Sequence, residues 1–256
     1  MASTTRKGLV VFSGGQDSTT CLFWALDRYG SKDTYAITFD YGQRHSRELT
    51  ASRTIARRVW GDERYEAHRS VCRVAGILRS TSPLVSDNEV GHYERPEDMP
   101  GGIEPTFVPM RNALFLTVAA NRAAALKGPV DIITGVSQED YGGYPDCRRL
   151  FIDSQQATIN AALGLYGSEE IRIETPLLTL SKVETVRLAE KLDGCLESLA
   201  YSHTCYDGEY PPNPKNHASI LRARGFDKAG IADPLILRAK QEGLLSADYP
   251  DSGLVV

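Results

Sequence analysis

The sequence predicts an α/β protein with a doubly wound parallel sheet and a small C-terminal extension of loop and helix. Short apolar runs rich in β-branched residues alternate along the chain with longer segments of helical periodicity. Strands that alternate with helices form right-handed crossovers, and these produce a parallel sheet. At 256 residues the chain is long enough for one such domain with an appendage. We expect the α/β domain to span residues 1–197 and the extension to span residues 198–256.

The expected elements of the α/β domain follow this alternation. The expected strands are 8–12, 34–42, 130–137 and 171–178. The expected helices lie within 17–30, 46–61, 111–128, 147–167 and 181–192. We expect Gly30 to end the first helix, since glycine commonly follows the last helical residue. The Ser181 hydroxyl is expected to cap the last of these helices.

Two stretches break the alternation. Residues 80–105 are polar and rich in proline and glycine, which indicates a long loop. Long loops inside compact domains are often functional, so this one is a candidate functional segment. From residue 198 onward the periodicity weakens, and the one helix that we expect there lies near residues 217–226.

Composition excludes some classes of protein. The chain has 29 Lys and Arg against 33 Asp and Glu, so its formal net charge is −4 and a strongly basic surface is missing. No apolar run approaches the roughly 18 residues of a membrane helix, and the N-terminus lacks the pattern of a signal peptide. We therefore expect a cytoplasmic protein that neither enters a membrane nor binds nucleic acid directly.

The five cysteines are scattered, odd in number and without a CxxC pair. This spacing argues against a disulfide framework and against a self-contained zinc finger, so we expect unpaired thiols. Cys21 lies near the start of the first helix, where a thiol can become reactive. Its place in the apolar run "TTCLFW" favours a packing role instead.

The segment "SGGQDS" between the first strand and the first helix has the features of a phosphate-binding loop. In an open α/β sheet this position, at the carboxyl end of a strand, is where ligands bind. Glycines let backbone N–H groups turn toward an anion, and the following helix N-terminus adds partial positive charge. The expected ATP-binding residues are Ser13, Gly14, Gly15, Gln16, Asp17 and Ser18. A carboxylate would repel phosphate directly, so Asp17 indicates a bridging Mg²⁺.

"SGGQDS" resembles the loop of the PP-loop ATP pyrophosphatases, which use ATP as an AMP donor. Within that superfamily the chain resembles the 7-cyano-7-deazaguanine (preQ0) synthase family. The matching motifs run in family order over nearly the whole chain: "VVFSGGQDSTTCL", "TFDYGQRHSREL", "FVPMRN", "YGGYPDCRRLFI", "TPLLTLSK", "HTCYDG", "LRARGF" and "AGIADPL". The resemblance implies an adenine nucleotide alpha hydrolase-like, Rossmann-like fold.

The same resemblance implies a reaction and its cofactors. Members of this family adenylate the carboxylate of 7-carboxy-7-deazaguanine with ATP and Mg²⁺, and ammonia then displaces AMP to give an amide. The amide is adenylated in turn and dehydrated to the nitrile. The implied partners are therefore ATP, ammonia and a small deazaguanine substrate, and we also expect a homodimer.

Adenylation brings two anions together, so cations must line the cleft. Arg111 and Lys182 each open a predicted helix, where the helix dipole does not favour a cation, so a role in binding phosphate is expected for both. Asp17 is the expected Mg²⁺ ligand. His45 is a candidate general base, although a lone histidine is more often structural.

A deazaguanine has a donor-rich edge that a carboxylate can accept in bidentate fashion. Asp146, held by the preceding proline, is the expected reader of this edge, with Tyr144 or Tyr141 stacking on the base or bordering it. Gln43 and Arg44 follow the end of the second expected strand and are further candidates for binding the substrate.

The C-terminal segment departs from the family pattern. The family implies four zinc cysteines there, and only Cys205 is present, because the other three positions hold Asn213, Asn216 and Ser219. Structural zinc takes Cys or His at each corner of a tetrahedron, and His217 is out of register. We therefore expect no zinc at this segment, and expect the asparagines to form turns or caps.

This departure leaves a second function open. The chain could adenylate the same carboxylate and transfer it to a protein amine, as in preQ0-synthase-like proteins of antiviral defence operons. A third class, a non-catalytic nucleotide-binding or scaffold protein, is disfavoured because it would need neither the intact loop nor the cations.

Overall fold

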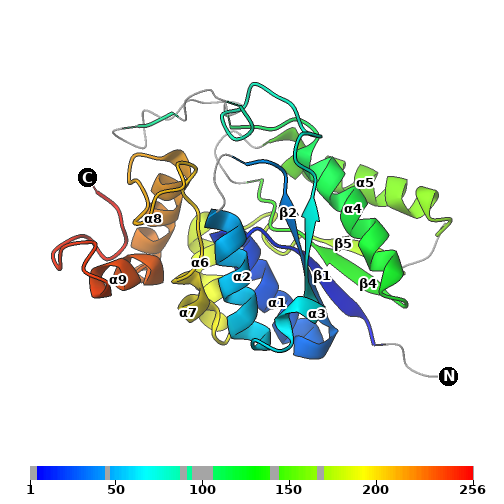
Figure 1. Cartoon of the computed structure of the whole chain (residues 1–256), viewed down its shortest axis with the longest axis horizontal. Helices are drawn as coiled ribbons and strands as arrows, with labels where there is room; N and C mark the ends of the chain where they lie inside the picture. The colour runs from blue at the N-terminus through cyan, green and yellow to red at the C-terminus, as the bar shows by residue number, and fades with distance from the viewer. Residues whose placement is uncertain are drawn as a thin grey trace.

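The computed structural model describes residues 5–43, 47–86, 91–93, 106–138, 144–165 and 170–255. Its centre is a five-stranded, all-parallel sheet, shown in Figure 1. The strands are β1 (Lys7–Val11), β2 (Thr34–Asp40), β3 (Arg69–Arg73), β4 (Val130–Ile133) and β5 (Ile171–Glu174). Their spatial order is β3-β2-β1-β4-β5, so the predicted doubly wound parallel sheet is confirmed.

Helices connect the strands and continue beyond the sheet. They are α1 (Gln16–Asp33), α2 (Arg47–Trp60), α3 (Tyr65–His68), α4 (Arg111–Ala125), α5 (Arg149–Ala162), α6 (Lys182–Lys191), α7 (Cys195–Leu199), α8 (His217–Ala229) and α9 (Pro234–Gln241), with a 3-10 turn, η2 (Pro145–Cys147). Ser181 caps α6 in a capping box with Glu184, as expected. Gly30 interrupts α1 with a φ of 75°, which confirms that the first helical run stops there.

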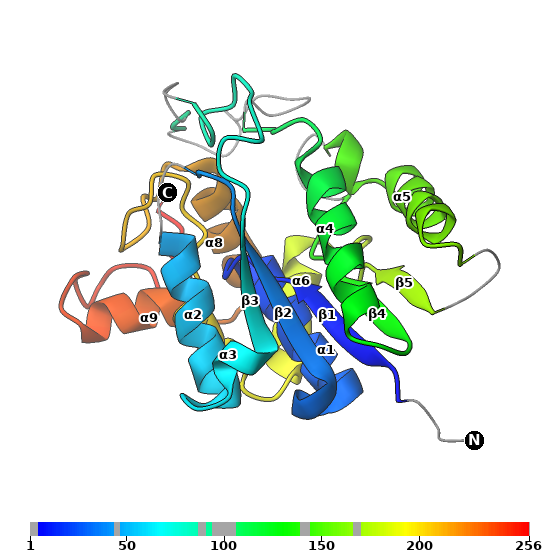
Figure 2. The same ribbon diagram turned by 45° about the vertical axis from the view of Figure 1, so that its right-hand side comes forward.

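Alternating side chains give the sheet two apolar faces, and helices cover both. Val10 and Ile133 belong to a core shared with α1, α2, α6 and α7. Leu9 and Ile132, their neighbours in sequence, belong to the core under α4 and α5. Figure 2 shows the two groups of helices on opposite sides of the strands.

Some elements were not predicted. β3 has the sequence "RSVCR", which lacks an apolar run because this edge strand is only partly covered, and Val71 is 45% exposed. The short helices α3 and α7 span little more than one turn, too little for a helical periodicity to show. α9 has the start signals that we overlooked, namely an Asp233 cap and proline at the first turn.

The strand order reverses direction between β1 and β4. From β1 the chain moves through α1 to β2 and then to β3, whereas β4 and β5 add on the other side of β1. Helices diverge at such a switch point and leave a crevice at the carboxyl ends of the strands. The predicted phosphate loop follows β1, so it lies at this crevice.

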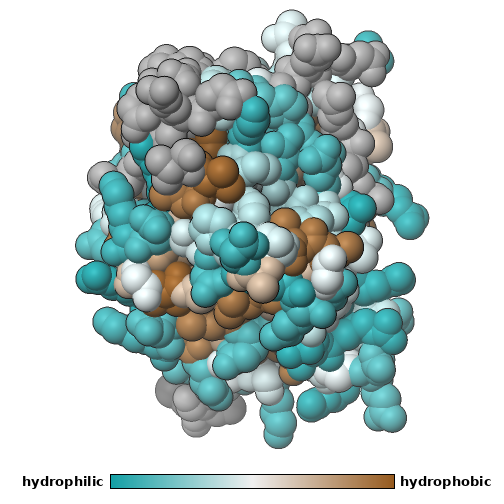
Figure 3. All heavy atoms as spheres, turned by 90° about the vertical axis from the view of Figure 1, so that its left-hand side faces the viewer, coloured by the Kyte–Doolittle hydropathy of each residue, from teal (hydrophilic) through white to brown (hydrophobic). Residues whose placement is uncertain are grey.

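The C-terminal extension packs on the helical layer rather than on the sheet. Gly225 of α8 lies so close to α6 that a Cβ there would be 3.1 Å from the Lys182 Cβ. Phe226 is fully buried in the core that contains Val10 and Leu22. The expected domain boundary near residue 197 therefore stays a proposal, because α8 of the extension shares a core with the α/β domain. The surface on this side has hydrophobic patches among hydrophilic side chains (Figure 3).

Two further expectations concern the state of the cysteines and the presence of membrane-spanning helices. All five cysteines are unpaired, and Cys21 is fully buried, which confirms its predicted packing role. Burial, and then the nearby Asp17, raise the pKa of the Cys21 thiol, so the reactive thiolate is disfavoured. In the part of the chain that the structure describes, no helix is both long and apolar enough to cross a membrane.

Candidate active site

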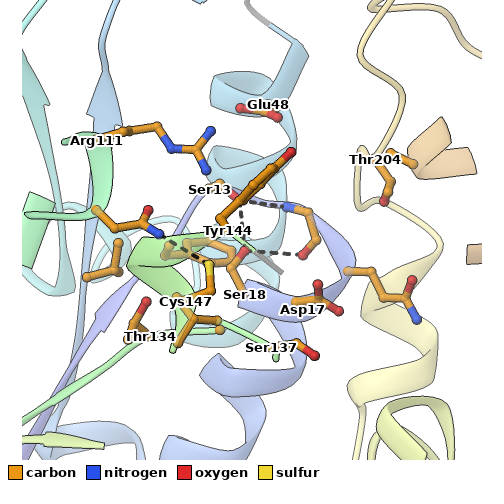
Figure 4. A pocket seen from close by; sticks show the side chains of 18 of the residues that line it. Ser13, Asp17, Ser18, Glu48, Arg111, Thr134, Ser137, Tyr144, Cys147 and Thr204 are labelled. Atoms are coloured by element: carbon orange, nitrogen blue, oxygen red, sulfur yellow. Dashed lines mark hydrogen bonds between the residues drawn. The ribbon is translucent and has the colours of Figure 1, made fainter. Parts of the chain in front are cut away.

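A cavity of about 290 Å³ lies at the carboxyl ends of β1, β2 and β4, at the switch point. Its wall includes residues from the ends of these strands, from the starts of α1, α4 and α6, and from the C-terminal extension. Figure 4 shows Arg111 and Thr204 on opposite sides of it, with Ser13 and Ser18 between them. The topology thus brings together segments that are up to about 200 residues apart in sequence.

The phosphate loop (residues 13–18) is shaped by its own hydroxyls. The hydroxyls of Ser13 and Ser18 are 3.0 Å apart, and Ser18 Oγ also accepts a hydrogen bond from Gly14 N at 3.1 Å. Ser13 Oγ accepts one from Gly15 N at 3.2 Å. These bonds use the N–H groups of Gly14 and Gly15 and fix the shape of the loop, while the N-terminus of α1 adds positive potential beside it.

Two glycines allow other elements to approach the loop. Gly14 has a φ of 89°, and a Cβ there would lie 2.6 Å from the backbone N of Ser52 in α2. Gly135, just after β4, would place a Cβ 3.1 Å from the Asp17 carbonyl carbon. Side chains at either position would push α2 or the start of α1 away. Gly135 was not singled out from the sequence, although a glycine after a buried strand is a signal for such an approach.

Asp17 and Lys182 meet at the edge of the loop. Lys182 Nζ donates to Asp17 Oδ2 at 2.7 Å, and both side chains are partly exposed. The other carboxylate oxygen, Oδ1, is buried and has no hydrogen-bond partner among the described residues. A buried carboxylate oxygen without a partner is costly unless a cation or donor reaches it.

These residues fit the magnesium that the family resemblance implies. Mg²⁺ is bound in nucleotide sites by one or two carboxylates together with phosphate oxygens and water, and Asp17 offers one free oxygen beside the phosphate loop. Among the described residues, no group of three or more His, Cys, Asp or Glu side chains is arranged to hold a metal ion. An ion here would therefore depend on the phosphates of a ligand.

Arg111 enters the cavity from the start of α4. The preceding residue, Met110, has a φ of 64°, which is unusual for a residue with a side chain and turns the chain sharply into the helix. The guanidinium points toward Glu48 of α2 (Figure 4). Burial raises the pKa of the Glu48 carboxyl to about 7, although Arg111 acts in the opposite direction. Glu48 is half-buried, so its carboxyl has a less apolar environment than a fully buried carboxyl would have.

Aromatic rings form an apolar part of the wall. Phe39 and Phe115 stack with their centroids 4.1 Å apart and their planes almost parallel, and Tyr41 packs against Phe115 at 5.5 Å. The Tyr144 hydroxyl forms a 2.7 Å hydrogen bond with Thr106 Oγ1 while the residue lines the cavity. A flat ring could be enclosed by such surfaces.

The predicted substrate residues differ in their placement. Tyr144 lines the cavity, as does Cys147, the neighbour of Asp146. Asp146 itself is buried behind this wall, where its carboxylate accepts from Asn112 N at the start of α4, at 3.4 Å. Burial raises the pKa of Asp146, and Arg111 counteracts this shift. Gln43 does not line the cavity, because its side-chain carbonyl accepts from Tyr41 N at 2.9 Å.

Three predicted residues lie outside the described part of the chain. They are Arg44, His45 and Tyr141. Their assignments therefore stay predictions.

The remaining side of the cavity is a segment that we call the C-terminal wall (residues 202–207). His203 N donates to Gly14 O at 2.9 Å, which joins this wall directly to the phosphate loop. Thr204 and Tyr206 line the cavity. Sequence reasoning did not assign these residues to the site, because no local pattern shows that a segment 189 positions beyond Gly14 returns to it.

Arg222 of α8 anchors one end of this wall. Its guanidinium forms a bidentate, almost fully buried ion pair with Asp233, at 2.6 and 2.8 Å. It also donates to the hydroxyls of Ser202 and Thr204, at 2.7 and 3.0 Å. Because all five guanidinium donors have a fixed geometry, this one side chain sets the spacing of several segments.

The positions at which the family resemblance implies zinc cysteines carry other donors here. Cys205 is buried, but Asn213, Asn216 and Ser219 offer neutral amide or hydroxyl groups, which are weak ligands for Zn²⁺. Asn216 caps α8 by accepting from Ala218 N at 3.1 Å, as expected for an asparagine in this segment. The donor set therefore does not fit structural zinc.

The fold and the loop together define a class. An all-parallel α/β sheet with a serine-glycine phosphate loop at its switch point is the arrangement of the PP-loop proteins. The family model described as "Queuosine biosynthesis protein QueC" matches residues 7–230, and the chain belongs to this family.

Curated relatives agree with this assignment. The chain is 46% identical over 233 residues to the 7-cyano-7-deazaguanine synthase of Gloeobacter violaceus, covering 90% of this chain and 95% of that protein. It is 42% identical over 250 residues to the enzyme of the same name from Chromobacterium violaceum, covering 94% and 97%. Among solved structures, the U34-tRNA thiolase NcsA from Methanococcus maripaludis matches at 15% identity. That match covers 95% of this chain and 73% of NcsA with a TM-score of 0.38, too low to support an argument.

Proposed function

We propose that this chain is an ATP-dependent 7-cyano-7-deazaguanine synthase. It would adenylate the carboxylate of 7-carboxy-7-deazaguanine and convert it with ammonia, through the amide, to the nitrile. The observation that carries the proposal is the environment of Asp17. One of its oxygens pairs with Lys182 and the other is buried without a described partner, at the start of α1, where the first N–H groups of a helix have no intrahelical partner. Such a site suits a polyphosphate chain with its cation.

The loop and the cations support the first step. A carboxylate oxygen of the substrate attacks the α-phosphorus of ATP, and pyrophosphate leaves. The N–H groups of the first turn of α1 would hold the departing pyrophosphate, and Lys182 and Arg111 would offset the charge that accumulates where two anions meet. Mg²⁺ bound through Asp17 would add Lewis-acid stabilisation of the phosphate oxygens.

The later steps reuse the same site. Ammonia attacks the acyl carbon and AMP leaves, which gives the amide. The amide oxygen then attacks the α-phosphorus of a second ATP and pyrophosphate leaves. Loss of AMP together with the two amide protons then gives the nitrile. The site must therefore exclude water, which competes with ammonia, and the apolar stack of Phe39 and Phe115 supports such exclusion.

The aromatic wall supports recognition of a flat heterocycle. Tyr144 can border the base, since it lines the cavity and its hydroxyl is fixed by Thr106. For Asp146 to accept hydrogen bonds from the base, its carboxylate would have to turn from Asn112 toward the cavity. Arg44, His45 and Tyr141 keep their proposed roles in binding and acid–base chemistry, as does the homodimer as the proposed assembly.

The direct test is turnover by the purified protein. ATP, Mg²⁺, 7-carboxy-7-deazaguanine and ammonia should yield the nitrile, detected by mass spectrometry, with release of AMP and pyrophosphate. Asp17→Ala should abolish pyrophosphate release, whereas Asp27→Ala, an exposed position on the same helix, should leave it unchanged. Normal turnover by the Asp17 variant would show that Asp17 has no part in the reaction.

A different acceptor would change the product and not the activation step. If the substrate carboxylate is activated with release of pyrophosphate but no nitrile forms, transfer to a protein amine is the function to test. Mass added to a protein encoded beside this gene would then identify the acceptor. The altered zinc positions are the feature of this chain that keeps the alternative worth testing.

A further inference from the structure

The segment in which the resemblance implies zinc ligands contains a compact polar cluster centred on Asp207. Its Oδ2 atom lies 3.0 Å from His92 Nε2, 3.2 Å from Asn216 Nδ2 and 3.9 Å from Cys205 Sγ. A carboxylate only accepts hydrogen bonds, so all three groups act as donors, and His92 carries a hydrogen on Nε2. One anionic oxygen therefore joins three segments, as a metal ion would.

Two of the cluster's members occupy positions that hold zinc ligands in the family. Cys205 keeps its thiol at the first position and directs it to Asp207. Asn216 replaces a cysteine and makes two kinds of contact, because its carbonyl caps α8 while its amide donates to Asp207. A thiol is only a weak donor and a weak acceptor. The substitution thus exchanges a metal bond for a helix cap and a charge-assisted hydrogen bond.

A segment from the other half of the chain closes the cluster. His92 forms an antiparallel bridge with Asn216, and Tyr93 N donates to Lys215 O at 2.9 Å. The Asp207 side chain is only 15% exposed beneath this contact, although His92 is 48% exposed. Shielding from water strengthens the hydrogen bonds to the carboxylate.

The cluster is continuous with the cavity. Asp207 is the last residue of the C-terminal wall, in which Tyr206 and Thr204 face the cavity. Cys205 O accepts from the His203 ring at 2.8 Å, and His203 N in turn donates to Gly14 O in the phosphate loop. A displacement of Asp207 would therefore move His203 and, through it, the phosphate loop.

We infer that the hydrogen-bonded cluster of Asp207, His92, Asn216 and Cys205 takes the place of a zinc ion and positions the C-terminal wall against the phosphate loop. Asp207 is a positioning residue: it touches no reacting atom and acts through Thr204 and Tyr206. Arg222 holds the beginning of the wall and Asp207 holds its end, so the cavity is closed on this side without metal. The predicted effect on ATP binding rests on the function proposed above, whereas the prediction that the wall needs no zinc does not.

The first experiment measures metal and stability. Protein purified from zinc-supplemented medium should contain no stoichiometric zinc, and a chelator should leave its melting temperature unchanged. Asp207→Ala should lower the melting temperature by about 3–6 °C, since three donors lose their acceptor. Glu209→Ala, which removes an exposed acid two residues away, should change it little.

The second experiment separates positioning from folding. Asp207→Ala should weaken ATP binding about tenfold, measured by calorimetry, while maximal turnover changes much less. Asp207→Asn, which keeps an acceptor oxygen but loses the charge, should fall between Asp207→Ala and the unmodified protein. It also serves as the test if the alanine variant fails to fold.

Restoring the metal ligands provides a rescue. The triple substitution Asn213→Cys, Asn216→Cys and Ser219→Cys, together with Cys205, should bind one zinc ion. In that background Asp207→Ala should regain ATP affinity when zinc is added. Stoichiometric zinc in the unmodified protein, or ATP affinity unaffected by both Asp207 substitutions, would overturn the inference. If the unmodified protein binds no ATP, the proposed function fails, and zinc content and melting temperature still decide whether the cluster replaces the metal.

Discussion

The phosphate loop and the C-terminal wall border the same cavity, but different kinds of contact hold them. Hydrogen bonds within the loop join residues at most five positions apart, such as Ser13 and Ser18. The wall depends on partners that are distant in sequence, such as His92 for Asp207, 115 positions away. Arg222 reaches Thr204 from α8.

Because of this difference, the loop and the wall should be disrupted by different substitutions. The local contacts of the loop form whenever the first strand and helix fold. The loop should therefore be sensitive only to substitutions of its own residues and of the residues that contact them. Long-range contacts exist only when the extension has folded onto α6 and α7. Damage far from the cavity should therefore disturb the wall first and reach the loop only through contacts such as the bond from His203 N to Gly14 O.

The largest expected effect comes from breaking the anchor of the wall. Arg222→Ala leaves Asp233 as a buried, unpaired charge and removes the donors to Ser202 and Thr204. Loss of one partner of a buried ion pair costs about 3–5 kcal/mol of unfolding free energy. Denaturant unfolding should show this loss, with weaker nucleotide binding. Lys228→Ala, at an exposed position of the same helix, is the control, and an equal effect in both variants would contradict the assignment.

A smaller loss is expected from a change in the loop. Gly14→Ala forces a side chain into a left-handed backbone and against Ser52 N, at a cost of about 2–4 kcal/mol. Nucleotide binding should be lost with it, as measured by calorimetry.

Gly15→Ala is the matched control within the loop. Its backbone has an ordinary φ of −78°, and a Cβ there would meet His203 O and Ser13 Oγ at 3.4 Å, which is normal contact. If both alanine variants lost the same unfolding free energy, the special backbone role of Gly14 would be disproved.

The smallest expected effect concerns Glu48, which lies beside both Gly14 and Arg111. Its pKa of about 7 in the folded protein lies above the ordinary value of about 4.5, because burial disfavours the charged carboxylate. The folded state then binds more protons than the unfolded state between these pH values, so stability falls as pH rises from about 4.5 to about 7. Glu48→Gln cannot ionise and should escape this fall.

Thermal unfolding across pH tests this prediction. Glu48→Gln should match the unmodified protein below about pH 4.5 and be more stable above pH 7, by about 1 kcal/mol once solvent exposure is considered. The matched control is Glu63→Gln, because it makes the same substitution at an exposed acid. A Glu48 variant that is less stable at pH 8 would show that pairing with Arg111 outweighs the cost of burial.

Local patterns predicted the elements that carry strong periodicity or a cap. Val10 and Ile133 lie in unbroken apolar runs, and Ser181 stands three residues before Glu184, so the strands and the start of α6 were visible. The edge strand around Val71 was not visible, because a half-covered strand needs no apolar run. In the site, the loop and the cavity positions of Arg111 and Lys182 followed from their places at helix starts.

What the sequence determined by itself is the chemistry of short segments: a glycine loop held by its own hydroxyls at the start of a helix, and a C-terminal segment with one of the four cysteines that the family implies. Each depends on residues a few positions apart, and local geometry follows from their types. The tertiary structure decided which contacts that C-terminal segment makes. Asp207 could take the place of a metal only because His92 and Asn216, distant from each other in sequence, fold against it and are shielded from water. Such a contact depends on the packing of the whole chain, so no local pattern encodes it.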